Sequence, residues 1–191
     1  MQVKDLTENQ KQNIKEICKS VPTHLKSFLK GNIPTLEDAR KKTNSTFRKQ
    51  AKKGVTMEEF YMGSKDYLIE LAVYASNPGR IQSVCKRLRV LKKLRAKHVV
   101  DFGAGMGIDS ICYASNGLRV INVEFDNPST EFANYLIRKL GLESRIIHIL
   151  PETFWNYTNS RKELWDAVQA IEVVAHVEDP HTTRNILELY Q

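Results

Sequence analysis

A glycine-rich turn behind a short strand constrains the fold of this 191-residue chain more than any other feature. The run from His98 to Phe102 has strand character and is followed by Gly103, Gly105 and Gly107, one at every second position. Glycine adopts backbone torsions that are closed to other residues and lets a ligand approach the main chain closely. Open parallel sheets bind ligands at the carboxyl ends of their strands. The segment therefore predicts a ligand site at the end of a first strand.

Strands and helices alternate along the rest of the chain, as expected for an α/β fold. The last predicted strand is almost continuously apolar, which is typical of a strand buried on both faces. The alternation predicts a doubly wound parallel sheet of about four strands with right-handed crossovers. The expected segments are a helix over Gly107–Ser115, a strand over Leu118–Glu124, a helix from Asn127-Pro128 to Gly141, strands over Arg145–Leu150 and Leu164–Val174, and a helix over Pro180–Tyr190.

The first 95 residues read as helices, and we expect two regions: a basic helical region over residues 1–95 and an α/β core over residues 96–191. Capping residues and proline at the first helical position mark where helices begin. The expected helical segments begin at Thr7 with Gln10, at Thr23 (running to Lys30, before Gly31), at Thr35 with Asp38, at Thr56 with Glu59 (interrupted at Gly63-Ser64 and resumed over Tyr67–Ala75), and at Asn77-Pro78.

Charge is distributed unevenly between the two regions. Residues 1–97 hold 22 Lys and Arg against 9 Asp and Glu, whereas the remainder of the chain is net acidic at −6. The basic half could attract nucleic acid, a phosphorylated substrate or a membrane surface. We favour solvated helix faces that complement the acidic half, because no RNA-binding motif accompanies the charge. On the helix after Asn77, the residues assigned to the basic outer face are Lys86, Arg87, Arg89, Lys92 and Lys93.

The amino terminus and the lack of a long apolar run suggest a cytoplasmic protein. No apolar run approaches the roughly 18 residues that suggest a membrane span, and the first residues lack the apolar centre of a signal peptide. Cys18, Cys85 and Cys112 are widely spaced, so we expect free thiols that are buried or half-buried.

An acidic residue follows the second strand of the core. Glu124 stands 17 residues after Gly107, about one helix and one strand later, where a carboxylate can accept both hydroxyls of a ribose. The turn reads D-x-G-x-G-x-G from Asp101, not the G-x-G-x-x-G of dinucleotide-binding folds. It resembles motif I of class I S-adenosylmethionine-dependent methyltransferases. The likeness runs from Val99 to Pro180, since WDAVQAIEVVAHVEDP from Trp165 resembles the fourth-strand segment of that family.

This resemblance implies a role for individual residues. The glycine turn would face the methionine part of the cofactor, and Asp101 would orient the turn or bind the cofactor's amino group. Glu124 would hold the ribose, Phe125 would pack on the adenine, and Glu152 is the candidate acid near the adenine amine. Ile171 and Glu172 would line the cofactor near the transferred methyl. The implied cofactor-binding set is Asp101, Gly103, Ala104, Gly105, Gly107, Glu124, Phe125, Glu152, Ile171 and Glu172.

Methyl transfer needs little acid–base chemistry, because holding the reactants in line provides most of the rate gain. A base is required only where the nucleophile must lose a proton. His176, just past the fourth strand, is the best candidate for that base, and its alternative role is to cap or pack the following helix. Some relatives bind a metal through E-x-x-E-H. Here Glu172 and His176 are present but Ala175 replaces the second acid, so we expect no metal site.

The resemblance implies a methyltransferase that uses S-adenosylmethionine, releases S-adenosylhomocysteine and acts on a small-molecule acceptor. The alternatives are an RNA or nucleic-acid methyltransferase that uses the basic half, and a non-catalytic cofactor-binding subunit. The family core has the strand order three-two-one-four-five-seven-six, and only four strands are recognisable here. An uncovered fourth strand would be an apolar edge. We therefore expect a piece of a longer polypeptide, or a homodimer or partner chain that covers the edge.

Four aromatic residues precede the basic helix: Phe60, Tyr61, Tyr67 and Tyr74. In many members of the family, helices before the core form a lid over the cofactor. Ordinary helix packing is the interpretation we favour for this aromatic cluster.

Overall fold

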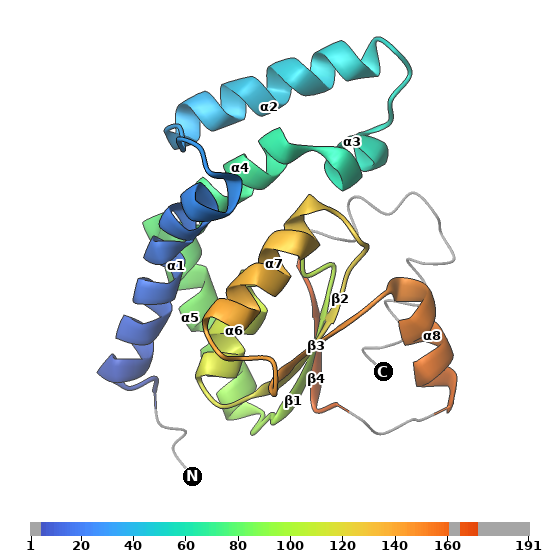
Figure 1. Cartoon of the computed structure of the whole chain (residues 1–191). Coiled ribbons are helices and arrows are strands. Elements are labelled where there is room, and N and C mark those ends of the chain that lie inside the picture. Colours follow the sequence, from blue (N-terminus) through green and yellow to red (C-terminus); the bar gives the residue numbers. More distant parts are fainter. Residues whose placement is uncertain (1–4, 161–164, 172–191) are drawn as a thin grey trace.

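The computed structural model describes residues 5–160 and 165–171 (Figure 1). Helices dominate the first half of the chain, and strands alternate with helices in the second half. The helices are α1 (Glu8–Leu29), α2 (Leu36–Ala51), α3 (Met57–Gly63), α4 (Lys65–Ala75), α5 (Pro78–Lys93), α6 (Ile108–Ser115), α7 (Pro128–Lys139) and α8 (Pro151–Ser160). The strands are β1 (His98–Phe102), β2 (Arg119–Val123), β3 (Ile146–Ile149) and β4 (Ala167–Ala170).

The four described strands form one parallel sheet in the order β3-β2-β1-β4. Val99 is in register with Val120 of β2 on one side and with Ala167 of β4 on the other. The chain moves outward from β1 to β3 and then returns to the opposite side of β1. This reversal makes the carboxyl ends of β1 and β4 a topological switch point, which is where open α/β sheets bind ligands. The predicted doubly wound parallel sheet is confirmed.

Helices cover both faces of the sheet, and alternate residues of each strand point to opposite faces. Val99 and Val120 belong to a large core that α1, α4, α5, α6 and α7 complete. Val100 and Phe102 belong to a smaller core around Phe154 of α8, which is fully buried. Figure 1 shows α8 alone on one side of the sheet and the other core helices on the opposite side.

The capping signals place the helix starts correctly. Thr7 and Thr56 form capping boxes with Gln10 and Glu59, in which each side chain accepts a hydrogen bond from the backbone N–H of the other. Asn77 caps α5, whose first residue is a proline. These contacts satisfy backbone N–H groups that have no partner within the helix, so a short sequence motif determines each boundary.

The amino-terminal helix is longer than the sequence analysis predicted. The expected separate stretch over Thr23–Lys30 is the continuation of α1, which passes through Pro22 without ending. The buried residues Ile14, Cys18, Val21 and Leu25 recur at helical spacing on both sides of the proline. Packing of this continuous apolar face outweighs the hydrogen bond that proline cannot donate.

The structure also corrects the prediction around the third and fourth strands. A helix that the sequence analysis did not predict, α8, begins directly after β3 and includes Glu152, because Pro151 occupies the first helical position and Phe154 is buried against the sheet. The described part of the fourth strand is shorter than the predicted Leu164–Val174, and its residues are half-buried. The helix predicted over Pro180–Tyr190 lies outside the described residues.

Two further expectations concern the whole molecule. Cys18 and Cys112 are buried free thiols and Cys85 is a half-buried one, as predicted. Among the residues that the structure describes, no helix combines the length and apolar character needed to cross a membrane.

Candidate functional site

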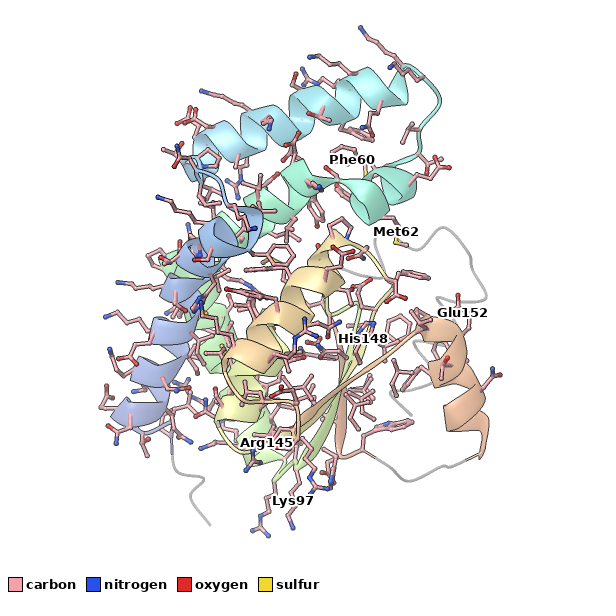
Figure 2. All side chains as sticks on the ribbon, viewed as in Figure 1. Phe60, Met62, Lys97, Arg145, His148 and Glu152 are labelled. Carbon is pink, nitrogen blue, oxygen red and sulfur yellow. The ribbon has the colours of Figure 1, made fainter. Side chains whose placement is uncertain are left out.

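A cavity of about 550 Å³ opens at the carboxyl ends of β1 and β2. Its walls come from the glycine turn, from α3, α4 and α5 of the helical region, and from the start of α8. Figure 2 shows two lining residues, Met62 and Glu152, near one end of the sheet, whereas Lys97 and Arg145, which precede β1 and β3, lie at the other end. The cavity therefore occupies the edge that the switch point predicts.

The glycine turn after β1 is built from left-handed backbone torsions. Gly103, Gly105 and Gly107 have φ values of 69°, 54° and 63°. A Cβ atom at Gly107 would lie 2.9 Å from Asn122 Nδ2, whereas one at Gly105 would meet no atom within 4 Å. Gly107 is therefore required both by its torsion and by close packing against β2. At Gly105 the space beside the backbone is open.

Glu124, the acid after β2, binds this turn directly. Its Oε2 atom accepts a hydrogen bond from the Gly105 backbone N–H at 2.7 Å, and Oε1 accepts one from the Phe125 N–H at 2.9 Å. Burial raises the pKa of Glu124, and these two bonds oppose the rise. Asn127 Nδ2 also donates to Oε1, at 3.5 Å. The Oε2 atom therefore retains a lone pair that can accept a hydrogen bond from a ligand hydroxyl.

Asp101 lies at the base of the cavity and is almost fully buried. Its Oδ2 accepts a hydrogen bond from the Ser110 hydroxyl at 2.6 Å, and Oδ1 accepts one from Gln169 Nε2 at 2.7 Å. Burial is the main cause that raises the pKa of Asp101 to about 7, and the nearby Asp109 adds to the rise. A carboxylate balanced between its two protonation states at neutral pH is typical of a functional site.

The structure brings most of the predicted cofactor-binding residues together. Gly107 is absent from the cavity lining and instead supports the turn against Asn122. Glu172 and the candidate base His176 lie outside the described residues. The predicted residues that line the one cavity are Asp101, Gly103, Ala104, Gly105, Glu124, Phe125, Glu152 and Ile171.

The aromatic cluster of the helical region divides into two roles. Phe60 is buried and packs against Phe47 and Tyr61. Tyr61, Tyr67 and Tyr74 line the cavity, and the Tyr61 and Tyr67 ring centroids lie 4.3 Å apart. Helix packing therefore explains Phe60, whereas the three tyrosines form an aromatic wall facing the glycine turn.

A charged cluster in the cavity wall was missed by the sequence analysis. Arg87 was assigned to the basic outer face of its helix, but its side chain is 23% exposed and turned inward, where it pairs with Asp109 of α6. Arg80, two turns earlier on α5, pairs with the same carboxylate. The signal available in the sequence was the helical spacing of Arg80, Ser83 and Arg87, which all line the cavity.

None of the family models and none of the curated proteins compared with this sequence matches it. Solved structures do resemble it. The methyltransferase domain of bacterial CtHen1 is 23% identical over 56% of this chain and 57% of its own, with a TM-score of 0.47. EvdMO1 is 19% identical over 56% of this chain and 27% of its own, with a TM-score of 0.46. SAH-bound PaMTH1 of Podospora anserina is 12% identical over 99% of this chain and 68% of its own, with a TM-score of 0.45.

The matches to CtHen1 and EvdMO1 thus cover about half and about a quarter of those chains. The fold assignment depends on the topology of the chain itself. A parallel sheet in the order β3-β2-β1-β4, with helices on both faces, a glycine turn after β1 and an acid after β2, is a Rossmann-like α/β fold.

Proposed function

We propose that this chain binds S-adenosylmethionine in the cavity above the glycine turn and transfers its methyl group to a small-molecule acceptor. The observation that carries the proposal is the convergence of the turn, Asp101 and Glu124 on one cavity at the switch point of the sheet. Topology alone would be weaker support, because many functions share one fold.

The residues present fit an adenosyl cofactor. The open space beside Gly105 admits a ligand against the backbone. Glu124 would accept a hydrogen bond from a ribose hydroxyl, and the exposed ring of Phe125 would pack on the adenine. Asp101 would accept a hydrogen bond from the amino group of the methionine part. When bound, the cofactor supplies a methyl group on a positively charged sulfur.

The protein's contribution to the reaction is mainly to position the reactants. A rigid turn, held by Gly103 N–H to Val123 O at 2.8 Å and by Gly105 N–H to Glu124, fixes the donor side of the cavity. Holding two reactants in line lowers the barrier by restricting their freedom before the reaction. His176 remains the proposed base for an acceptor that must lose a proton.

The cavity wall favours a small acceptor over a nucleic acid. Tyr61, Tyr67 and Tyr74 offer an aromatic surface opposite the turn. The charged lining residues are four acids, Asp101, Asp109, Glu124 and Glu152, and two arginines, Arg80 and Arg87. An excess of acids repels a polyanion and suits an uncharged or cationic acceptor.

Calorimetric titration with S-adenosylhomocysteine tests cofactor binding directly. We expect saturable one-site binding by the wild-type chain, and the absence of heat at millimolar ligand would end the proposal. Incubation with methyl-labelled donor and a small-molecule extract then tests transfer. Binding without transfer, in every extract tried, would favour a non-catalytic cofactor-binding subunit.

Nucleic acid is the competing acceptor, and the basic face of α2 gives it a specific surface. Arg48, Lys49 and Lys52 are exposed together at the end of this helix, which lies away from the sheet in Figure 1. Labelling of RNA rather than small molecules would favour this alternative. An RNA mobility shift that weakens with salt and with Lys49→Gln and Lys52→Gln would locate the contact on α2.

A further inference from the structure

Two arginines and one aspartate form an ion cluster in the wall of the cavity. Arg80 Nη2 lies 2.7 Å from Asp109 Oδ1, and Arg87 contacts Asp109 Oδ2 through Nη2 at 2.6 Å and through Nε at 2.7 Å. The Asp109 side chain is 5% exposed, and each arginine side chain is 23% exposed. All three residues line the cavity beside Asp101 and the glycine turn.

The cluster carries one more positive than negative charge. A buried charge is costly unless an opposite charge compensates it. Arg87 is directed at Asp109, because its Nε donates a hydrogen bond to Oδ2 at 2.7 Å and its Nη2 makes an ion-pair contact with the same oxygen at 2.6 Å. Among the described residues, Arg80 contacts an acid through Nη2 alone. A guanidinium has five N–H donors, so Arg80 has donors left to offer a ligand in the cavity.

Asp101 lies close to the uncompensated positive charge of this cluster. Tyr113, which Arg87 contacts, donates its hydroxyl hydrogen to Gln169 Oε1 at 2.8 Å, and Gln169 Nε2 donates to Asp101 Oδ1 at 2.7 Å. Two hydrogen bonds and the electrostatic contact between Arg87 and Tyr113 therefore connect the arginine cluster to Asp101, and both ends line the same cavity. A carboxylate and a guanidinium beside one another match the ammonium and the carboxylate of an α-amino acid.

We propose that Arg80 binds the α-carboxylate of the cofactor's methionine part while Asp101 receives its α-ammonium group. The two residues would thus recognise the amino-acid end of the ligand as a zwitterion, and Glu124 would recognise the ribose. A monoanion fits better than a phosphate dianion, because the cluster has a single surplus charge and Asp109 lies within 2.7 Å of the Arg80 guanidinium. This inference rests on the proposed function.

The test compares two ligands on one variant by calorimetry. The ligands are S-adenosylhomocysteine and its decarboxylated analogue, which keeps the nucleoside, the sulfur and the amine. For the wild-type chain we expect about 10- to 100-fold tighter binding of S-adenosylhomocysteine, the range for a charge-assisted hydrogen-bonded pair. Arg80→Gln should remove most of this preference and leave the affinity for the analogue within about twofold, since the analogue lacks the group that Arg80 would bind.

The controls separate this inference from the proposed function. Lys86→Gln removes an exposed positive charge from the same helix and should leave both affinities unchanged. If Arg80→Gln unfolds, Arg80→Lys keeps the charge without the forked donors and should show a smaller loss for S-adenosylhomocysteine alone. An equal loss for both ligands, or no loss, would overturn the role of Arg80. A wild-type chain that binds neither ligand would instead end the proposed function.

Discussion

The Gly105 backbone N–H donates a hydrogen bond to Glu124 Oε2 across 2.7 Å, which joins the turn after β1 to the end of β2. The two residues are 19 positions apart in the sequence. One carboxylate therefore shapes the turn and also faces the cavity that the turn lines. Substitution at Glu124 tests the placement of the ribose most directly.

Glu124→Gln should weaken binding of S-adenosylhomocysteine by about 1–3 kcal/mol, the scale for losing a hydrogen bond to a charged group. The amide has one oxygen, so it cannot accept from both the Gly105 and Phe125 N–H groups. Calorimetric titration measures the effect. Glu131→Gln, an exposed acid in the first turn of α7, is the matched control. Equal affinities of wild type and Glu124→Gln would show that the ribose lies elsewhere.

The free energy of unfolding of the unliganded chain should decrease as the pH rises, because of Asp101. Its pKa of about 7 in the folded chain lies above the ordinary aspartate value of 3.8, so the folded state holds the proton more tightly. The associated stability is fully present below about pH 4 and is lost as the pH rises to about 7. Asp101→Asn should abolish this loss, which we expect to be about 2–4 kcal/mol. Urea unfolding at pH 5 and pH 8 measures it, and parallel pH profiles for the two proteins would contradict the assignment.

Ligand binding should show the opposite pH dependence. An ammonium group binds the ionised form of Asp101, so the affinity for S-adenosylhomocysteine should rise as the pH increases from 6 to 8. The expected rise is about fivefold to tenfold, set by the fraction of carboxylate that must lose its proton. Calorimetry at several pH values measures the rise. The Asp101→Asn variant should bind weakly at every pH, and a retained pH dependence would identify a different group.

Gly107→Ala should destabilise the fold more than Gly105→Ala. Both residues have left-handed torsions, which cost an alanine about 1–2 kcal/mol. Only the methyl group at position 107 would also approach Asn122 Nδ2, at 2.9 Å. Denaturant unfolding without ligand should therefore separate the two variants by about 1 kcal/mol or more. Equal stabilities would mean that Asn122 moves aside without cost.

Phe154→Ala should cost about 3–5 kcal/mol of stability, the range for truncating a buried aromatic residue. Phe154 is fully buried, and its ring centroid lies 6.0 Å from that of Phe102 and 5.5 Å from that of Trp165. Thermal or urea unfolding measures the loss. Ile147→Ala on β3 is the control, since this side chain is 60% exposed and should tolerate truncation. A small effect at Phe154 would show that α8 contributes little to the sheet.

Local sequence signals predicted the order of elements and part of the site. Caps such as Asn77 and Asn127 act on the residues that immediately follow them, so they can be recognised without tertiary structure. The glycine turn and Glu124 follow strand ends, and a parallel sheet brings such ends to one edge. These positions were therefore predictable once the strands were recognised.

The remaining features depend on contacts between distant segments. Arg87 belongs to a strongly basic helix and resembles its exposed neighbours in sequence. Its side chain nevertheless points inward, because it forms an ion pair with Asp109 on another helix. Pro22 has the local signature of a helix breaker, and only the core that α1 contacts explains why the helix continues through it. The positions of Tyr61, Tyr67 and Tyr74 in the cavity wall depend on how α3 and α4 pack over the sheet. The hydrophobic periodicity of those two helices does not predict this packing.

The packing of the amino-terminal helix α1 limits which fragments of this chain can keep the cavity intact. Ile14 and Leu25 of α1 share one core with Phe132 and Leu136 of α7, so the helical region and the sheet protect each other from water. A fragment starting near residue 96 would keep the glycine turn but expose the apolar face of α7 to water. It would also lose Arg80 and the three tyrosines from the cavity wall. The cavity above the glycine turn is therefore a property of the two regions as a single cooperative unit.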